Sequence, residues 1–452
     1  MFTTWVYGAF GWLSDRLTGD WMAGVAAFCI LQGVLHVVAF AAAVAYLRRV
    51  GCPPVLNLLA FAYFALAPFV STWALCMVKD SFFGLFYVPY FMLVFETVRT
   101  RGACMARPRN VAAFVLCALG LCLTKKTGIF VVAATAVVGI VAYRRTKAAW
   151  EAFLMQGLLP AVVVMVLFPL LVFPALNIQA GGAQETLGPL FQQTARCIRD
   201  YPKDVSPEEK AAISAVLDYD RLAEQYQFDF EDSVKYRYNL NATRADLVRY
   251  LQAYAAMGLR HPDSYFGALM SLAGFYVAPT APINIRMVTV DTKMGDEQRY
   301  MLWNPDELNG LRNGLDEAYD AVAKMPVADL PLLLVTYVFW LPALLAFVAF
   351  RNRLRCWTLF VPALVLLGFC VIAPVYDARY AVPILDAAPL FFCGVVVLLK
   401  HSTMDASTIW RNDARPEPGR TGRQPAECQP ARRDNHGVEV RHAGDGGMLR
   451  TA

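Results

Sequence analysis

Three short charged groups interrupt a strongly apolar chain, and each lies between two apolar runs. They are Lys79-Asp80, Lys125-Lys126 and the segment from Asp377 to Tyr380, which contains Arg379. Charged side chains are costly beside lipid, so those next to apolar runs often mark functional sites. Three cationic groups on one face would suit a phosphate or pyrophosphate. The structural alternatives are a self-neutralising Lys-Asp pair, lysines that snorkel to the membrane surface, and a tyrosine anchor.

A fourth group lies inside an apolar run. Asp386 follows Arg379 by seven residues, which is two helical turns, and Pro383 and Pro389 flank it. A proline-broken helix around a carboxylate can line a polar cavity, whereas the structural alternative is pairing with a neighbouring helix. His36 lies in the middle of another apolar run, and we interpret it as a core histidine.

The sequence contains no recognisable motif for binding a metal ion or a nucleotide. The chain has no CxxC motif and no Cys/His spacing typical of zinc, and it lacks phosphate-loop and dinucleotide motifs. We therefore predict no metal site and identify no cofactor, and a divalent metal requirement stays open. Membrane lipids are expected partners, no nucleic acid is expected, and the oligomeric state is open.

The elements that position these groups are predicted to be membrane-spanning helices. Of the 452 residues, 57% are hydrophobic and 17% are charged. A bilayer core of about 30 Å needs roughly 20 apolar residues per helix, and the long apolar runs satisfy this length. The prediction is an all-α integral membrane protein with about nine spans, at residues 21–47, 54–76, 81–98, 111–124, 127–143, 153–176, 329–350, 357–375 and 380–399.

Lys and Arg are enriched in the loops that follow the odd-numbered spans. Such loops face the cytoplasm in most membrane proteins. The chain would then begin outside and end in the cytoplasm, and three of the charged groups would share the outer face of a bacterial inner membrane. An outside N-terminus without a visible signal peptide suggests that an upstream span precedes this sequence. The basic residues are Arg48, Arg49, Arg99, Arg101, Arg107, Arg109, Arg144, Arg145, Lys147, Arg351, Arg353, Arg355 and Lys400.

The predicted regions are six spans in 1–176, a large outer-face segment in 177–328, three spans in 329–400 and a disordered cytoplasmic tail in 401–452. The outer segment is expected to be mostly helical. Its apolar stretch from Tyr265 to Pro279 is too short to span comfortably. It is either an interfacial or re-entrant helix or the core of a small outer domain.

Multiple spans, a Lys-Asp pair in an outer loop, a large outer segment and a late Arg-Tyr followed by proline together resemble the GT-C class of membrane glycosyltransferases. The chain is also similar to a bacterial multi-pass family of unknown function that is thought to be related to that class. The similarity covers about residues 1–400. The motifs that carry it are Thr3-Trp5-Tyr7-Gly8, Lys79-Asp80, Lys125 to Gly128, Leu190 to Arg196, and Ala378 to Pro383.

The resemblance implies transfer of a sugar from a polyprenyl-phosphate donor to an acceptor at the outer face. Arg379 and Tyr380 would contact the donor phosphate, with Lys79, Lys125 and Lys126 as further cations and with Asp80, Asp377 and Asp386 in support. The catalytic acid of this class usually follows the first span, and only Asp15 and Asp20 are candidates here. The alternatives are a transporter or flippase of a lipid-linked or anionic substrate, and a non-catalytic membrane scaffold.

Overall fold

The computed structural model describes residues 2–178, 184–280, 283, 306–373, 375 and 377–413. Within these residues the secondary structure is helical, with three isolated β-bridges and no strand. The chain divides into two compact units, Met1–Thr403 and Met404–Ala452. All the contacts that build the candidate site lie in the first unit. The predicted tail begins inside the last helix, and its residues 414–452 lie outside the described residues.

The first two helices form a hairpin. Helix α1 spans Phe2–Thr18 and α2 spans Trp21–Arg49. Gly19 has φ +74°, a conformation that glycine adopts readily, and Asp20 caps α2 by accepting a hydrogen bond from Met22 N at 2.8 Å. A Cβ on Gly24 would overlap the backbone of Phe10, so this glycine lets the two helices approach closely.

The predicted span at 54–76 is broken in two. Helix α3 covers Pro54–Leu66 and α4 covers Pro68–Leu75, with a bend of 54° between them. Pro68 has no backbone N–H and disfavours a helical conformation of the residue before it, and Ala67 is extended there, so α3 ends at Leu66. After the bend the chain enters α5, Lys79–Arg99.

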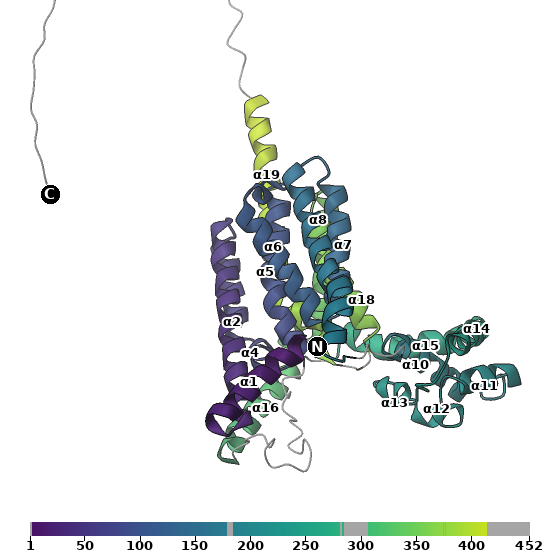
Figure 1. The fold of residues 1–452 in the computed structure, drawn as a ribbon. Coiled ribbons are helices and arrows are strands. Elements are labelled where there is room, and N and C mark those ends of the chain that lie inside the picture. The colour runs from purple at the N-terminus through teal and green to yellow at the C-terminus, as the bar shows by residue number, and fades with distance from the viewer. Residues whose placement is uncertain are drawn as a thin grey trace, which may run out of the picture. The chain divides into compact units, whose positions relative to one another are not determined.

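Helices α5 to α8 run side by side (Figure 1). Helix α6 spans Pro108–Thr124, α7 spans Thr127–Ala142 and α8 spans Lys147–Val162. Helix α8 continues through the π-helical stretch η2, Val163–Val172, into the short α9, Phe173–Ala175. Only Lys125 and Lys126 separate α6 from α7, so this hairpin places both lysines at one end of the bundle.

The polar segment folds around its own small core of aromatic and aliphatic side chains, which includes Phe191, Leu222 and Tyr250. The apolar stretch at 265–279 forms α15, which contacts α10 and α14 on one side and α18 on the other. It is therefore part of the core of this segment, and it also joins the segment to the bundle. The helices are α10 Gln184–Asp200, α11 Pro207–Ser214, α12 Tyr219–Gln225, α13 Asp232–Lys235, α14 Arg244–Arg260, α15 Pro262–Val277 and α16 Asn309–Ala323.

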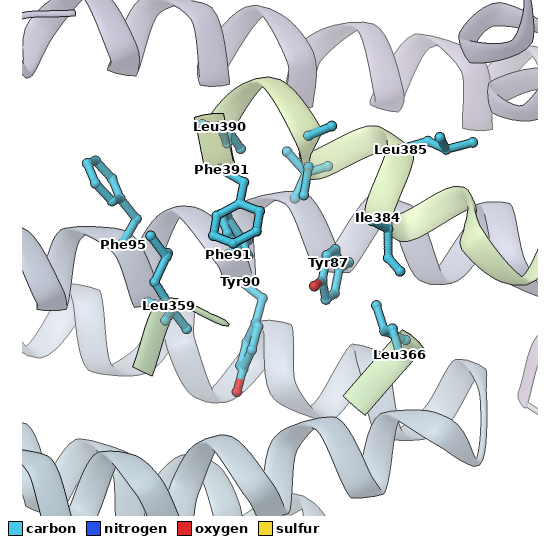
Figure 2. Close-up of a cluster of buried hydrophobic side chains, with 14 of the residues drawn as sticks. Tyr87, Tyr90, Phe91, Phe95, Leu359, Leu366, Ile384, Leu385, Leu390 and Phe391 are labelled. Carbon is cyan, nitrogen blue, oxygen red and sulfur yellow. The ribbon is translucent and has the colours of Figure 1, made fainter. Parts of the chain in front are cut away.

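The last helices complete the bundle. After the π-helical stretch η6, Thr336–Trp340, come α17, Leu341–Arg351, and α18, Trp357–Val371. A short 3-10 turn, η7, Ala378–Ala381, leads into α19, Val382–Asp413. Figure 2 shows α5 packed against α18 and α19 through large buried side chains. The labelled residues are Tyr87, Tyr90, Phe91, Phe95, Leu359, Leu366, Ile384, Leu385, Leu390 and Phe391.

All nine predicted apolar segments contain helix, but their lengths differ. Four helices in the described residues are long and apolar enough to cross a membrane, and the bent pair α3–α4 would be a fifth. The other four apolar segments are helices of 10–17 residues, so crossing by all nine stays a prediction. The four long helices are Trp21–Arg49, Lys79–Arg99, Lys147–Ala175 and Ala378–Ser402.

Candidate functional site

A buried ion pair lies at the centre of the candidate site. Asp80, in the first turn of α5, accepts a hydrogen bond from the Lys125 ammonium group. The Asp80 side chain is 1% exposed and that of Lys125 is 12% exposed. Lys125 follows the last residue of α6 in an extended conformation, so its side chain leaves the hairpin and reaches α5. The second carboxylate oxygen of Asp80, Oδ2, is buried and has no hydrogen-bond partner.

Tyr380 joins this pair to a second cation. The Lys125 Nζ lies 4.8 Å from the centre of the Tyr380 ring, and the Arg379 guanidinium carbon lies 4.9 Å from it. Cations at such distances are attracted to the electron-rich face of an aromatic ring. Arg379 Nη2 also donates a hydrogen bond of 2.8 Å to the Tyr380 hydroxyl. Two predicted cationic groups from distant parts of the sequence therefore meet at one tyrosine.

Asp377 holds the Arg379 segment in place. Its carboxylate accepts a hydrogen bond from the backbone N–H of Arg379 at 3.0 Å, and its Oδ2 lies 3.5 Å from Arg379 Nε. Its backbone carbonyl accepts a hydrogen bond of 2.9 Å from the Tyr276 hydroxyl of α15. Burial raises the pKa of Asp377, and the Arg379 contacts oppose that rise. The polar segment therefore contacts the site through Tyr276.

Lys79 and Lys126 are more exposed than the central residues. Asp80, Lys125, Arg379 and Glu185 are the electrostatic neighbours of Lys79. Glu185 belongs to α10 and lies 3.5 Å from Lys235, so the polar segment also contributes acidic groups near the site. Lys126 follows Lys125 in the sequence.

Helix α1 also reaches the site. The Tyr7 ring lies 4.7 Å from that of Phe28 and 6.1 Å from that of Phe82, and its hydroxyl is buried without a partner. Burial and the nearby charge of Asp80 raise the pKa of Tyr7. The Thr3-Trp5-Tyr7-Gly8 and Lys79-Asp80 motifs therefore meet in space.

The two acids expected near the N-terminus have different surroundings. Asp20 is exposed and caps α2 through its bond to Met22 N, which is a structural role. Asp15 is half-buried on α1, about two helical turns beyond Tyr7. Asp80, which was predicted only as a supporting residue, is the carboxylate that lies among the cations.

Asp386 lies deeper in the bundle. Its side chain is 3% exposed, and its Oδ2 has no hydrogen-bond partner. A Cβ on Gly84 of α5 would overlap this oxygen, so Asp386 faces α5 one turn below Asp80. The sequence predicted a proline-broken helix with Asp386 on the same face as Arg379, but Arg379 lies in the 3-10 turn η7 and α19 continues through Pro389. The sequence did not predict the facing residue, because contacts between helices are not visible in one sequence.

Three features of the site were not predicted from the sequence: Tyr276, Glu185 and the approach of Tyr7 to Asp80. Tyr7 belongs to a quoted motif, which was the available signal for it. Tyr276 and Glu185 carried no such signal, because they lie in the polar segment far along the chain. The Leu190–Arg196 motif lies in α10, where Arg196 donates a hydrogen bond of 3.0 Å to Ser271 Oγ in α15.

The arrangement favours binding of an anion. Lys79, Lys125 and Arg379 supply three positive charges, and Asp80 and Asp377 supply two negative ones. Glu185 near Lys79 adds a third negative charge, which is paired with Lys235. Arginine and lysine are the usual partners of phosphate oxygens. Among the described residues there is no group of three or more His, Cys, Asp or Glu side chains that could hold a metal ion.

Comparison with known proteins gives a family. Neither a search of curated proteins nor a search of solved structures found a match. Residues 1–417 match the Family of unknown function (DUF6020), a range that includes the bundle, the polar segment and every residue of the candidate site. The chain therefore belongs to the DUF6020 family.

Proposed function

We propose that the protein is a GT-C-type glycosyltransferase of a bacterial inner membrane, which transfers a sugar from a polyprenyl-phosphate donor to an acceptor at the outer face. The observation that carries this proposal is the cluster of Lys79, Lys125 and Arg379 around the buried carboxylate of Asp80. The cluster lies at the ends of apolar helices, where a lipid phosphate would meet the protein while its chain stays in the bilayer. Nine spans and an outer-face polar segment belong to the same proposal.

The cations would act on the leaving group. As the bond between the sugar C1 and the phosphate oxygen breaks, its electron pair goes to the phosphate. Fixed cations in a water-poor site stabilise such developing charge. Arg379 and Lys125 are held by Tyr380, Asp377 and Asp80, so they need little rearrangement to do this.

Asp80 is the carboxylate best placed to act as the general base that deprotonates the acceptor hydroxyl. Its unpartnered Oδ2 can accept the proton of an acceptor hydroxyl, while the acceptor oxygen forms the new bond to C1. Binding of the donor phosphate to Lys125 would compete with the ion pair between Lys125 and Asp80. This assigns to Asp80 the role that the resemblance leaves to Asp15 or Asp20.

Binding of polyprenyl phosphate to the purified protein in lipid nanodiscs tests the proposal. Arg379→Ala is expected to weaken binding by roughly tenfold or more, because a hydrogen bond to a charged group contributes about 1.5–3 kcal/mol. Arg355→Ala is the matched control. Arg355 is exposed and precedes α18, whereas Arg379 follows it, so the two arginines lie at opposite ends of that helix. Equal binding by both variants would contradict the proposal.

One observation favours a second candidate function, a transporter or flippase. Asp386 is a buried carboxylate in the interior of the bundle, and such residues often line ion or proton pathways in transporters. Movement of labelled polyprenyl phosphate between bilayer leaflets, without sugar transfer, would support this candidate over the transferase.

A further inference from the structure

A groove opens on the side of the helix bundle between α6 and α8, which pack side by side (Figure 1). Its volume is about 620 Å³, within the usual range of about 300–1,000 Å³ for ligand-binding sites. It lies at the Pro108 end of α6, whereas Lys125 of the candidate site follows the other end of this helix. The groove is therefore separate from the cluster around Asp80.

Small side chains on two neighbouring helices create the groove. Its lining residues recur at helical spacing over about two turns, from Pro108 on α6 and from Ala148 on α8, so each set lies on one face of its helix. On the inward faces of the same helices, the rings of Phe114 and Phe153 pack 5.5 Å apart and leave no such space. The residues that form the two walls are Val111, Ala112 and Val115 of α6 and Ala148, Ala152 and Met155 of α8.

The lining suits an apolar occupant. Among the described residues that line the groove, Glu151 alone is polar. Water would find few hydrogen-bond partners there, and an empty groove would lose the dispersion contacts of its walls. The lining also includes Leu116 and Met155, whose side chains are 64% and 48% exposed. In a membrane, the hydrocarbon chains of lipids are the apolar molecules that surround such a groove.

Positive charges lie at the end of the groove where both helices begin. Arg107 and Arg109 flank Pro108, and Lys147 directly precedes Ala148. All three side chains are exposed. Lys147 lies 3.9 Å from Glu151, whereas within the described part of the chain neither arginine forms an ion pair.

The other acid near this end does not neutralise the arginines. Glu96 of α5 is an electrostatic neighbour of Arg107, but it is bonded to Arg99 and to the Tyr46 hydroxyl. The end of the groove therefore keeps an excess of positive charge. Arginine side chains bind phosphate oxygens strongly, and basic pockets between membrane helices bind anionic lipid headgroups.

We propose that this groove binds an anionic phospholipid, with an acyl chain between α6 and α8 and its phosphate against Arg107, Arg109 and Lys147. A zwitterionic phospholipid has an acyl chain of the same kind, but its headgroup carries its own cation and gains less from the three basic residues. The proposal rests on the membrane location that belongs to the proposed function. It does not require sugar transfer or transport.

Native mass spectrometry of the full-length protein in detergent tests the role of the charges. Phosphatidylglycerol and phosphatidylcholine with identical chains are titrated separately, and the affinity for the first bound lipid is compared. We expect phosphatidylglycerol to bind more tightly. The double variant Arg107→Gln/Arg109→Gln should weaken its binding by roughly 30-fold, about fivefold for each charge removed.

The double variant Arg351→Gln/Arg355→Gln is the matched control. Both arginines are exposed and lie in the loop between α17 and α18, which does not line the groove. This control and Arg379→Ala should keep the affinity of the parent protein for phosphatidylglycerol. Equal affinities for the two lipids, or equal losses in the two double variants, would overturn the proposal. Neither result bears on polyprenyl-phosphate binding at Arg379, so the two proposals fail separately.

Ala112→Trp tests the place of the acyl chain. Ala112 is exposed and lines the groove, so an indole there should fit on the surface of the folded protein and fill the space of the chain. We expect phosphatidylglycerol binding to fall by roughly tenfold, the effect of excluding about two CH₂ groups. Ala133→Trp is the control, because Ala133 is an exposed residue of α7 outside the groove.

Glycerol phosphate separates a lipid site from a site for phosphate alone. It carries the anionic phosphate without acyl chains, and it should not displace phosphatidylglycerol at equal concentration. Displacement by glycerol phosphate, or equal binding by Ala112→Trp and Ala133→Trp, would mean that the groove does not hold the chain, and the proposal would fail.

Discussion

The Asp80–Lys125 pair shows how a buried charge is kept at one end of the bundle. Each side chain alone would be an uncompensated charge in a place with little water. Together they balance, and Lys125 gains a second favourable contact with the Tyr380 ring. Removal of one partner from such a pair is usually much more costly than removal of both.

We predict that Lys125→Met lowers the free energy of unfolding by about 3 kcal/mol, the usual scale for breaking a buried pair. Asp80→Asn in the same chain should restore a large part of this loss, because it removes the unpaired negative charge. Chemical denaturation of the two single variants and of the double variant measures the coupling between the residues. Strictly additive losses would show that the two side chains do not interact in the folded protein.

A second buried acid makes stability depend on pH. Glu231 in the polar segment is 3% exposed and its Oε2 has no partner. Burial raises its pKa from 4.5 to about 8, with Lys235 opposing the rise. The folded state therefore binds a proton more tightly than the unfolded state. Its contribution to stability is largest below pH 4.5 and is lost as the pH rises to about 8.

We predict that Glu231→Gln removes this part of the pH dependence. In the parent protein the slope from this group reaches at most about 1.4 kcal/mol per pH unit inside that window. Thermal melting across the window measures the difference, with Glu224→Gln as a control on an exposed residue of the same segment. A parent and a Glu231→Gln variant with parallel pH profiles would contradict the prediction.

At the scale of residues, the sequence revealed the charged groups but not their partners. Lys79, Asp80, Lys125 and Arg379 could be identified because charge is rare among apolar runs, and the predicted topology assigned them to one face. The contacts of Tyr276 with Asp377, and of His36 and Asp386 with Gly84, arise from the packing of distant helices. No spacing in a single sequence encodes such contacts.

Among the elements, the α6–α7 hairpin determines where Lys125 lies. Its turn is only two residues long, and Gly128 in the first turn of α7 lies directly against the end of α6. A Cβ on Gly128 would overlap the carbonyl group of Leu121. The missing side chain therefore allows the two helices to cross closely enough for Lys125 to reach Asp80.

We predict that Gly128→Ala lowers the free energy of unfolding by about 1–3 kcal/mol, the usual cost of overpacking. It should also weaken phosphate binding, because the hairpin would open and shift Lys125. Gly274→Ala is the control. Gly274 lies inside α15 with open space around its Cβ position, so alanine should be neutral or slightly stabilising there. Equal stability of the two variants would show that the hairpin does not need its glycine.

The elements were easier to predict than their shapes. The apolar runs predicted the place of each apolar helix in the chain, but not all of the boundaries. The segment predicted to begin at residue 329 forms its apolar helix only from Thr336, and the one predicted to end at residue 399 continues as α19 to Asp413. The break at Pro68 could not be predicted from the proline alone, because Pro89, Pro160 and Pro362 lie inside α5, α8 and α18 without ending them. The bridging contacts of α15 could not be predicted either, because its composition suits an interfacial helix and a domain core equally well.

At the scale of the whole molecule, the proposal of nine spans depends on whether the shorter apolar helices are long enough to cross a bilayer. Helix α7 has 16 residues and would be about 24 Å long, which is shorter than a bilayer core of about 30 Å. Short spans are tolerated, because the bilayer can thin and flanking basic residues can extend to the surface at a modest cost. Helix α7 has basic residues at both ends, Lys125-Lys126 and Arg144-Arg145, so it meets this condition.

We therefore predict that α7 crosses the membrane and that cysteines introduced at its two ends are labelled from opposite sides. Lys126→Cys and Asn241→Cys should react with a membrane-impermeant maleimide on intact cells, whereas Arg145→Cys and Arg355→Cys should react only after permeabilisation. All four positions are exposed, and the native cysteines in the described residues are buried or half-buried. Cys428 lies outside the described residues and is replaced by serine in the parent and in every variant. Labelling of Lys126→Cys and Arg145→Cys from the same side would mean that α7 does not cross. The polar segment would then be reassigned to the other side of the membrane, because the orientation of every later helix depends on this crossing.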